Sequence, residues 1–216
     1  MIPPQPPTPP RLVIFDFDGT LADSFPWFVS VLNGVAARYG FRPVRPEEQE
    51  RLRGCDTRSL LRHLRVPLWK LPFIARHMRA LMASDINAIA LFDGVPDLLR
   101  TLHARGVVIA VVSSNSPDNI RRVLGPDLSA LVTHLACGAS LFGKPAKFRQ
   151  VLRALTIPPH HALAIGDETR DIEAARRVGI ACGAVTWGYA SADALAARRP
   201  DHMFDRVERI ADAFRL

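Results

Sequence analysis

The sequence predicts an α/β protein, with a doubly wound, Rossmann-like parallel sheet and an inserted all-helical domain. Short apolar, β-branched segments at 12–15, 107–112 and 162–165 have the length and composition of buried strands. From residue 107 onwards such segments alternate with helical patterns, as in sheets whose strands are joined by crossover helices. Residues 24–91 instead carry apolar residues at helical spacing and contain no convincing strand.

The chain of 216 residues is long enough for one large domain or for a domain with an insertion. We expect a flexible, proline-rich tail at 1–10, an α/β core domain made of 11–23 and 92–216, and a helical domain at 24–91. In the helical domain, glycine and proline separate predicted helices at 25–39, 47–53, 57–64 and 68–82. In the core, strands are predicted at 12–15, 107–112, 134–137, 162–165 and 180–186, and helices at 97–105, 118–124, 146–155, 169–178, 192–199 and 207–214.

The composition limits the cellular compartment and the kinds of binding partner that we expect. Three widely spaced cysteines, without a C-x-x-C pair, indicate a reducing compartment, and we expect a cytoplasmic protein. Residues 1–10 lack the features of a signal peptide, and no apolar stretch approaches the roughly 20 residues of a membrane span. The net charge of +7 comes from dispersed cations, so we expect no nucleic-acid partner and no membrane. The sequence does not indicate whether the protein is a monomer or a homodimer.

Two carboxylates follow the first predicted strand directly. Asp16 and Asp18 lie two residues apart, so on an extended backbone both project to the same side. At an effective dielectric of about 20, two unit charges ~4 Å apart repel by about 4 kcal/mol, so we expect a cation between them. Gly19, followed by Thr20, permits a tight turn that presents N–H groups to an anion. Two solvated aspartates at a strand end are the alternative interpretation.

Polar residues also follow the strands predicted at 107–112 and 162–165, and Lys144 precedes a helix between them in the chain. Because ligands of doubly wound sheets bind beyond the carboxyl ends of the strands, we expect these residues to meet at one edge. The candidates at the strand ends, in chain order, are Asp16, Asp18, Ser113, Ser114, Asn115, Asp167, Glu168 and Asp171.

These residue types suit phosphoryl transfer, in which catalysis is mainly positioning and charge neutralisation. Asp16 is the candidate nucleophile that forms an aspartyl-phosphate. Asp18 is the candidate acid–base, which protonates the leaving oxygen and then deprotonates the attacking water. We expect the Ser113 hydroxyl and the Ser114 N–H to hold phosphate oxygens, and Lys144 to neutralise the nucleophile and the phosphate.

The carboxylates also suit a hard divalent cation, and no Cys or His lies among them to suit zinc. Asp167 is the candidate metal ligand, supported directly or through a hydrogen bond by Asp171 or Glu168. Each segment has a plainer interpretation as well: 113–116 as a helix cap, and 143–145 as a loop. The coincidence of all four segments, in order and at strand ends, favours the catalytic interpretation.

The four segments resemble the motifs of the haloacid dehalogenase superfamily of hydrolases, specifically its phosphoglycolate phosphatase-like members with a helical, C1-type cap. Residues 16–20 (DFDGT) match the first motif, Ser113 the second, Lys144 the third and 166–171 (GDETRD) the fourth. The resemblance covers nearly the whole chain from Arg11 onwards.

The resemblance implies that the cofactor is Mg²⁺, held by the carboxylates of Asp16 and Asp167 and the backbone carbonyl of Asp18, with Asp171 beside them. It also implies that the first-motif strand lies between the strands of the second and fourth motifs. The candidate substrate-binding residues are Gly19, Thr20, Ser113, Ser114, Asn115 and, in the cap, Arg53.

In this family the cap closes over the site and contacts the leaving group. Arg53 and Arg58 flank the loop between two predicted cap helices, and either could meet a carboxylate or second phosphate of the substrate. Solvated helix-end charges are the alternative for both. Residues 24–26 and 91–94 are the expected hinge strands. A phosphonate-cleaving hydrolase would need a cap lysine, and Lys70 is the only one in the sequence of 24–91.

Asp18 favours phosphate esters over carbon–halogen bonds, because an alkoxide leaving group needs a proton and a halide does not. The leading prediction is therefore a Mg²⁺-dependent phosphatase that hydrolyses a small phosphomonoester, with phosphoglycolate as a candidate. A phosphotransferase or phosphomutase of the same superfamily is the first alternative. A non-catalytic phosphate-binding or interaction module is the second, and the intact acids speak against it.

Overall fold

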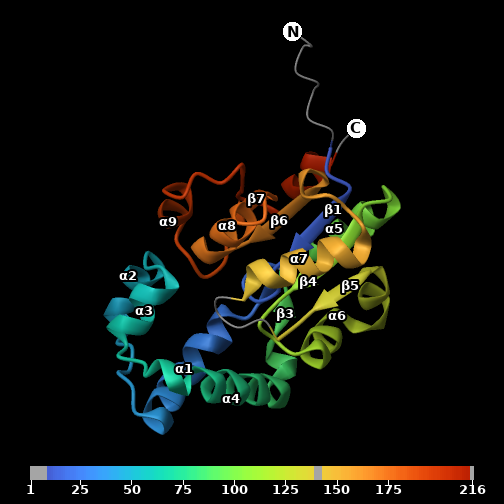
Figure 1. Ribbon diagram of the computed structural model, residues 1–216. Coiled ribbons are helices and arrows are strands. Elements are labelled where there is room, and N and C mark those ends of the chain that lie inside the picture. Colours follow the sequence, from blue (N-terminus) through green and yellow to red (C-terminus); the bar gives the residue numbers. More distant parts are fainter. Residues whose placement is uncertain (1–8, 139–142, 215–216) are drawn as a thin grey trace.

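The computed structural model describes residues 9–138 and 143–214 of the chain (Figure 1). The tail predicted at 1–10 lies outside the described residues except for its last two positions. Figure 1 shows one sheet with helices on both of its faces, and a group of further helices beyond one end of it.

A six-stranded sheet in the order β5-β4-β1-β6-β7-β8 forms the centre of the molecule, and all neighbouring strands are parallel. This confirms the predicted α/β fold. It also confirms the central place of β1, since Phe15 of β1 pairs with Val111 of β4 and with Ile165 of β6. The strands are β1 (Leu12–Phe15), β4 (Val108–Val112), β5 (His134–Ala136), β6 (Ala162–Gly166), β7 (Ala181–Val185) and β8 (His202–Phe204).

The side chains of β1 alternate between two apolar clusters. Val13 and Phe15 belong to the cluster on the face covered by α5, α6 and the 3₁₀ helix η5. Leu12 and Ile14 belong to the cluster on the face covered by α7 and α8. Full burial of each such side chain contributes about 1.5–3 kcal/mol, so both layers hold the sheet. The helices of the core are α5 (Val95–Ala104), α6 (Pro117–Leu131), α7 (Lys144–Leu155), α8 (Thr169–Arg176), α9 (Ala192–Ala196) and η5 (Val207–Phe214).

Several elements of the core differ from the predicted bounds, and three of the differences have a clear local cause. The helix predicted at 118–124 continues as α6 to Leu131, because two helices adjoin across a kink where Gly125 has φ +69° and ψ 172°. The helix predicted at 146–155 begins two residues earlier, since Pro145 is tolerated in a first helical turn. Strand β8 was not predicted; its three residues are too few for an alternating pattern, and two of them are exposed.

An antiparallel pair, β2 (Ala22–Asp23) and β3 (Ala90–Leu91), joins the sheet to the helical insertion, which we define as residues 24–91. The hinge strands predicted at 24–26 and 91–94 were therefore placed wrongly. Helix α1 already begins at Phe25 with Pro26 in its first turn, and Gly94 lies in a turn before α5 with φ +82°. Residues 24–26 therefore belong to the start of α1 and residues 93–94 to a turn, while Leu91 lies in β3.

The helical insertion has an apolar cluster of its own, which includes Val35, Phe41, Leu52 and Leu64. Its elements are α1 (Phe25–Tyr39), η1 (Pro46–Glu48), α2 (Gln49–Arg53), α3 (Thr57–His63), η2 (Leu68–Lys70), α4 (Leu71–Ser84) and η3 (Ile86–Ala88). All four α-helices were predicted in the sequence, with 3₁₀ turns preceding α2 and α4 in place of their first residues.

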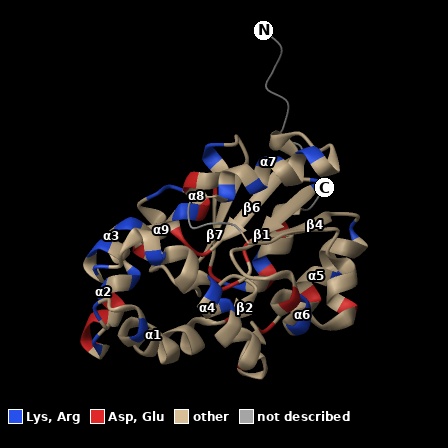
Figure 2. Cartoon of the chain, turned by 60° about the horizontal axis from the view of Figure 1, so that its bottom comes forward, with Lys and Arg blue, Asp and Glu red and all other residues tan. Residues whose placement is uncertain are grey.

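Lysine and arginine are spread over helices in several parts of the molecule and do not gather on a single element (Figure 2). Among the described residues, no helix is both long enough and apolar enough to cross a membrane.

Candidate active site

Asp16 is fixed by the sheet although it lies beyond the last residue of β1. Its N–H donates to the carbonyl of Ile165 on the neighbouring strand at 2.8 Å, which continues the pattern of the sheet. One carboxylate oxygen, Oδ1, accepts the N–H of Phe17 at 2.7 Å, and the other lies 2.5 Å from Lys144 Nζ. Both Asp16 and Lys144 are buried, so this ion pair is shielded from solvent.

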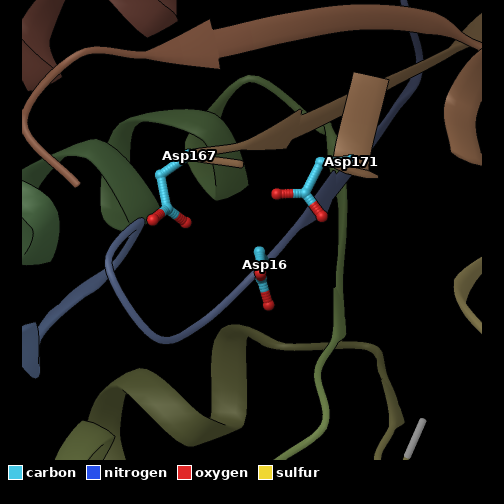
Figure 3. A group of neighbouring side chains, drawn as sticks. All are labelled: Asp16, Asp167 and Asp171. Atoms are coloured by element: carbon cyan, nitrogen blue, oxygen red, sulfur yellow. The ribbon is translucent and has the colours of Figure 1, made fainter. Parts of the chain in front are cut away.

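Three buried aspartates surround one small space (Figure 3). Carboxylate oxygens of Asp16, Asp167 and Asp171 lie within 4.8 Å of one another, although 155 positions separate the first from the last. The structure thus brings together the ends of β1 and β6, as the sequence analysis expected.

Asp171 and Lys144 hold each other in place. Asp171 lies at the third position of α8, where its Oδ2 accepts the N–H of Glu168 at 3.0 Å in a capping box. Its other oxygen binds Lys144 Nζ, which thereby contacts Asp171 and Asp16 together. Glu168 points its own carboxylate elsewhere, to Arg170 and to the hydroxyl of Thr57.

The carboxylate of Asp167 is oriented by two hydrogen bonds. Thr20 Oγ1 donates to Asp167 Oδ1 at 2.7 Å, and the N–H of Tyr189 donates to Oδ2 at 2.8 Å. Two glycines permit this close packing: a Cβ on Gly19, whose φ is +78°, would lie 2.2 Å from Asp167 Oδ2, and one on Gly188 would lie 2.3 Å from Asp167 Cβ.

The three buried aspartates share one ion-paired ammonium, that of Lys144. Burial, then the charge of Asp16, raises the pKa of Asp167 well above its usual value. Burial also raises the pKa of Asp16, although Lys144 opposes this effect. Burial by itself would lower the pKa of Lys144, but Asp16 and Asp171 raise it, so the ammonium stays charged. A group of buried carboxylates with one shared ammonium is stabilised by a further cation.

The donor set fits Mg²⁺, the cofactor implied by the resemblance. The three carboxylates supply hard oxygen ligands, and none of the grouped side chains is a sulfur or imidazole donor. Asp167 fits best because no cation of residues 9–138 and 143–214 forms an ion pair with it, while an oxygen of Asp16 and one of Asp171 face Lys144.

Asp18 lies in the turn after β1 and is held from the second-motif strand end. Asn115 Nδ2 lies 3.1 and 3.3 Å from the two carboxylate oxygens of Asp18. Asn119, in the first turn of α6, donates to Asn115 Oδ1 at 3.0 Å and so fixes the amide orientation. Burial, then the charge of Asp16, raises the pKa of Asp18 to about 6. The predicted substrate-binding residue Asn115 thus contacts the candidate acid–base.

Ser113 and Ser114 lie where the second motif was expected. Ser113 is buried, and its Oγ accepts the N–H of Asn115 at 3.0 Å. The carbonyl of Ser114 accepts Arg79 Nη1, from α4 of the helical insertion, at 3.1 Å. Ser114 borders a cavity of about 710 Å³ between the insertion and the core, with Asp18 also on its wall.

The helical insertion contributes one predicted residue to the same cavity. Arg53 lines it, but the guanidinium also donates to the carbonyls of Gly188 and Tyr189 in the core. Arg58 lines a second cleft of about 290 Å³, which reaches Lys144. Lys70 Nζ donates to the Tyr39 carbonyl at 2.6 Å and does not line either cavity, which disfavours the phosphonate alternative.

The sequence analysis did not identify the segment 186–191 after β7, which we call the β7 loop. It supplies the Tyr189 N–H to Asp167, and Trp187 Nε1 donates to the Thr20 carbonyl at 3.2 Å. The rule that sites lie at the carboxyl ends of parallel strands applies to β7 as well, and a glycine between two aromatic residues there was the available signal.

Comparison with known proteins agrees with this geometry. The family model described as "Haloacid dehalogenase-like hydrolase" matches residues 13–185. The chain is 34% identical over 204 residues to a phosphoglycolate phosphatase of Synechococcus elongatus, covering 94% of this chain and 96% of that protein. It is 29% identical to phosphoglycolate phosphatase 1 of Pseudomonas aeruginosa, over 92% of this chain and 77% of that one.

Two solved structures share the fold. A candidate phosphoglycolate phosphatase from Lactobacillus plantarum superposes with a TM-score of 0.81 at 21% identity, covering 96% of this chain and 100% of that one. CbbY from Rhodobacter sphaeroides, in complex with phosphate, gives 0.74 at 24% identity, covering 95% and 99%.

The chain therefore belongs to the haloacid dehalogenase-like hydrolase family, and the resemblance seen in the sequence is confirmed. It is an enzyme of that family, a phosphatase, similar along nearly its whole length to proteins named phosphoglycolate phosphatases.

Proposed function

We propose that the protein is a Mg²⁺-dependent phosphatase that hydrolyses a small phosphomonoester through an aspartyl-phosphate at Asp16. The observation that carries this proposal is the contact of one buried ammonium, Lys144 Nζ, with both Asp16 and Asp171, beside the carboxylate of Asp167. Lys144 is only 3% exposed. Aspartates that were merely solvated at a strand end would not need a buried lysine to neutralise them.

In the first step, a carboxylate oxygen of Asp16 attacks the phosphorus of the substrate. The hydrogen bonds of Asp16 to Phe17 N–H and Lys144 hold this carboxylate in one orientation. Asp18, in its protonated form, donates its proton to the leaving alkoxide, and the P–O bond to that oxygen breaks. Burial favours the protonated form of Asp18, because its pKa is raised to about 6.

In the second step, Asp18 is ionised and accepts a proton from a water molecule. That water attacks the phosphorus, the bond to Asp16 breaks, and inorganic phosphate leaves with the original carboxylate restored. Lys144 stabilises the negative charge on the phosphate and on Asp16 in both steps. Bound Mg²⁺, held by Asp16, Asp167 and the Asp18 backbone carbonyl, would supply further neutralisation of the phosphate oxygens.

The substrate we propose is a small phosphorylated metabolite of the cytoplasm, with phosphoglycolate the first candidate. The names of the relatives from Synechococcus elongatus and Pseudomonas aeruginosa support this choice. We propose that residues 24–91 act as the cap, with β2 and β3 as the hinge. The cavity between this segment and Asp18 supports that role, because a leaving group beside Asp18 would lie against the insertion.

The test is hydrolysis of 4-nitrophenyl phosphate and of phosphoglycolate, followed by phosphate release, with Mg²⁺, with a chelator, and for Asp16→Asn. We expect activity only with Mg²⁺ and a loss of at least about 1,000-fold in the variant, since the nucleophile is removed. Turnover that persists with the chelator or in the variant would contradict the mechanism. Consumption of phosphate ester without phosphate release would favour a phosphotransferase.

A further inference from the structure

Arg53 connects the helical insertion to the core by its side chain and its backbone. Its Nη2 donates to the Gly188 carbonyl at 2.8 Å and its Nε to the Tyr189 carbonyl at 3.2 Å. Its own carbonyl accepts the N–H of Ser191 at 3.0 Å. All three partners lie in the β7 loop. A planar guanidinium can span two adjacent carbonyls in this way, whereas a lysine ammonium would act as a single point charge.

The Arg53 side chain is also enclosed from the insertion side. Its guanidinium lies over the ring of Phe25, 5.1 Å from the centroid, and Nη1 contacts Glu50 at 3.3 Å. Only 24% of the side chain is exposed. Three of its nitrogen atoms are therefore engaged by the protein, which leaves little of the guanidinium for a substrate carboxylate.

The other side of the β7 loop holds Asp167. The Tyr189 N–H donates to Asp167 Oδ2 and the Ala190 N–H to the Asp167 carbonyl at 3.3 Å. Gly188 packs so closely that an added Cβ would lie 2.3 Å from Asp167 Cβ and 2.5 Å from the Gly19 carbonyl oxygen. The Gly188 carbonyl that accepts Arg53 Nη2 and the Tyr189 N–H that orients Asp167 belong to the same planar peptide unit, so the two groups cannot move independently.

The same loop contacts the hinge and the first helix of the insertion. Tyr189 Oη and Ser24 Oγ, next to β2, are 3.0 Å apart. The Tyr189 ring packs edge-on against Phe25 and Phe28 of α1, with centroids 5.1 and 5.4 Å away. Residues 188–191 of the β7 loop are therefore held between the insertion and Asp167.

We propose that Arg53 is a positioning residue that couples docking of the helical insertion to the orientation of the Asp167 carboxylate. When the insertion is docked, Arg53 holds the Gly188–Tyr189 peptide, and Tyr189 N–H holds Asp167 in the orientation that binds the divalent cation. When Arg53 is removed, the loop relaxes and the cation binds less tightly, whichever substrate is used. The identity of the cation as Mg²⁺ rests on the proposed function.

The test is Mg²⁺ binding to the full-length enzyme without substrate, measured by isothermal titration calorimetry for wild type, Arg53→Gln, Arg53→Lys and Arg51→Ala. We expect Mg²⁺ affinity to fall about 10- to 100-fold in Arg53→Gln, the usual effect of losing a group that orients a metal ligand. Arg53→Lys should recover part of it. Arg51→Ala is the matched control: Arg51 lies on the same helix, is 67% exposed and pairs with Glu48 within the insertion.

A second readout needs no metal. Backbone amide hydrogen exchange of Tyr189 and Ala190 should be faster in Arg53→Gln than in wild type, and unchanged in Arg51→Ala. Equal exchange and equal Mg²⁺ affinity in wild type and Arg53→Gln would overturn the inference. A wild type that binds no Mg²⁺ would instead contradict the proposed function, and the exchange data alone would then decide the role of Arg53.

The experiment also separates positioning from substrate binding. If Arg53 bound the substrate carboxylate, Arg53→Gln would raise KM for phosphoglycolate, leave KM for 4-nitrophenyl phosphate unchanged and leave Mg²⁺ affinity intact; that pattern would overturn the inference. Positioning predicts the same fold-loss of kcat/KM for both esters at limiting Mg²⁺, with recovery at high Mg²⁺. If Arg53→Gln does not fold, Arg53→Lys carries the same comparison.

Discussion

Asp16 and Asp18 carry the same functional group two positions apart, yet their surroundings suit the different roles that we propose for them. Burial raises the pKa of Asp16, but the ammonium of Lys144 opposes this effect and favours the ionised form that a nucleophile needs. Asp18 contacts the neutral amide of Asn115, and burial raises its pKa to about 6. A carboxylic acid that can be protonated near neutral pH suits a proton donor.

Asp18→Asn should distinguish leaving groups. For an alkyl phosphate such as phosphoglycolate we expect a loss in kcat/KM of about 100- to 10,000-fold, because an alkoxide must be protonated as it leaves. For 4-nitrophenyl phosphate the loss in the first step should be much smaller, since nitrophenolate is a weak base. Rapid-quench kinetics of the first turnover with both esters give the measurement.

The pH dependence follows from the same residue. Asp18 must be protonated in the first step, and the protonated fraction falls as pH rises through its pKa. Wild-type kcat/KM for phosphoglycolate should therefore decline by about tenfold per unit above that pKa, a limb that 4-nitrophenyl phosphate and Asp18→Asn should lack. An equally steep limb in Asp18→Asn would contradict the assignment.

Among the elements, η1 and α2 of the helical insertion meet at Glu48, whose carboxylate has several cationic neighbours. The side chain of Glu48 is 8% exposed, and its Oε1 accepts Arg42 Nη2 at 2.7 Å. Hydrogen bonds from Arg42 and Arg45 lower the pKa of Glu48 from 4.5 to about 2. A depressed pKa means that the ionised form stabilises the fold, fully above about pH 4.5 and progressively less as pH falls towards about 2.

Glu48→Gln should therefore lower the free energy of unfolding at about pH 7, and the gap to wild type should narrow by about pH 3.5. Urea titrations at both pH values measure it. Glu47→Gln is the control, because Glu47 is 68% exposed and its ion pair with Arg45 spans 3.7 Å. If the difference in the free energy of unfolding between wild type and Glu48→Gln stayed constant with pH, Glu48 would act through its shape and not its charge.

At the scale of the whole molecule, much of the site can be predicted from the sequence because the parallel strands all end at the same edge of the sheet. Once β1, β4 and β6 are recognised as buried strands, the carboxyl-edge rule places Asp16, Ser113 and Asp167 together, although they are far apart in the chain. The carboxyl-edge rule does not predict contacts that depend on the length and direction of side chains. The bond of Lys144 to Asp171 is an example, since both were predicted only as site residues.

Interactions between the insertion and the core were the least predictable part. Arg53 was predicted to bind the substrate, and it does line the cavity beside Asp18. Its bonds to backbone carbonyls of the β7 loop were not predicted, because backbone carbonyls carry no sequence signature. The hinge strands were misplaced because two-residue strands are too short for any periodicity to indicate them. Of the long helices, which have several apolar turns each, α1 was predicted to the residue and α4 to within three residues at each end.

The most direct test of the account is the mass of the enzyme during turnover. Wild-type enzyme mixed with Mg²⁺ and substrate, quenched in acid within one turnover and digested, should yield the peptide containing Asp16 with one added phosphoryl group. The modification should disappear when substrate is exhausted and be absent in Asp16→Asn. A phosphoryl group on any other residue, or none while phosphate is released in a burst, would contradict nucleophilic catalysis by Asp16.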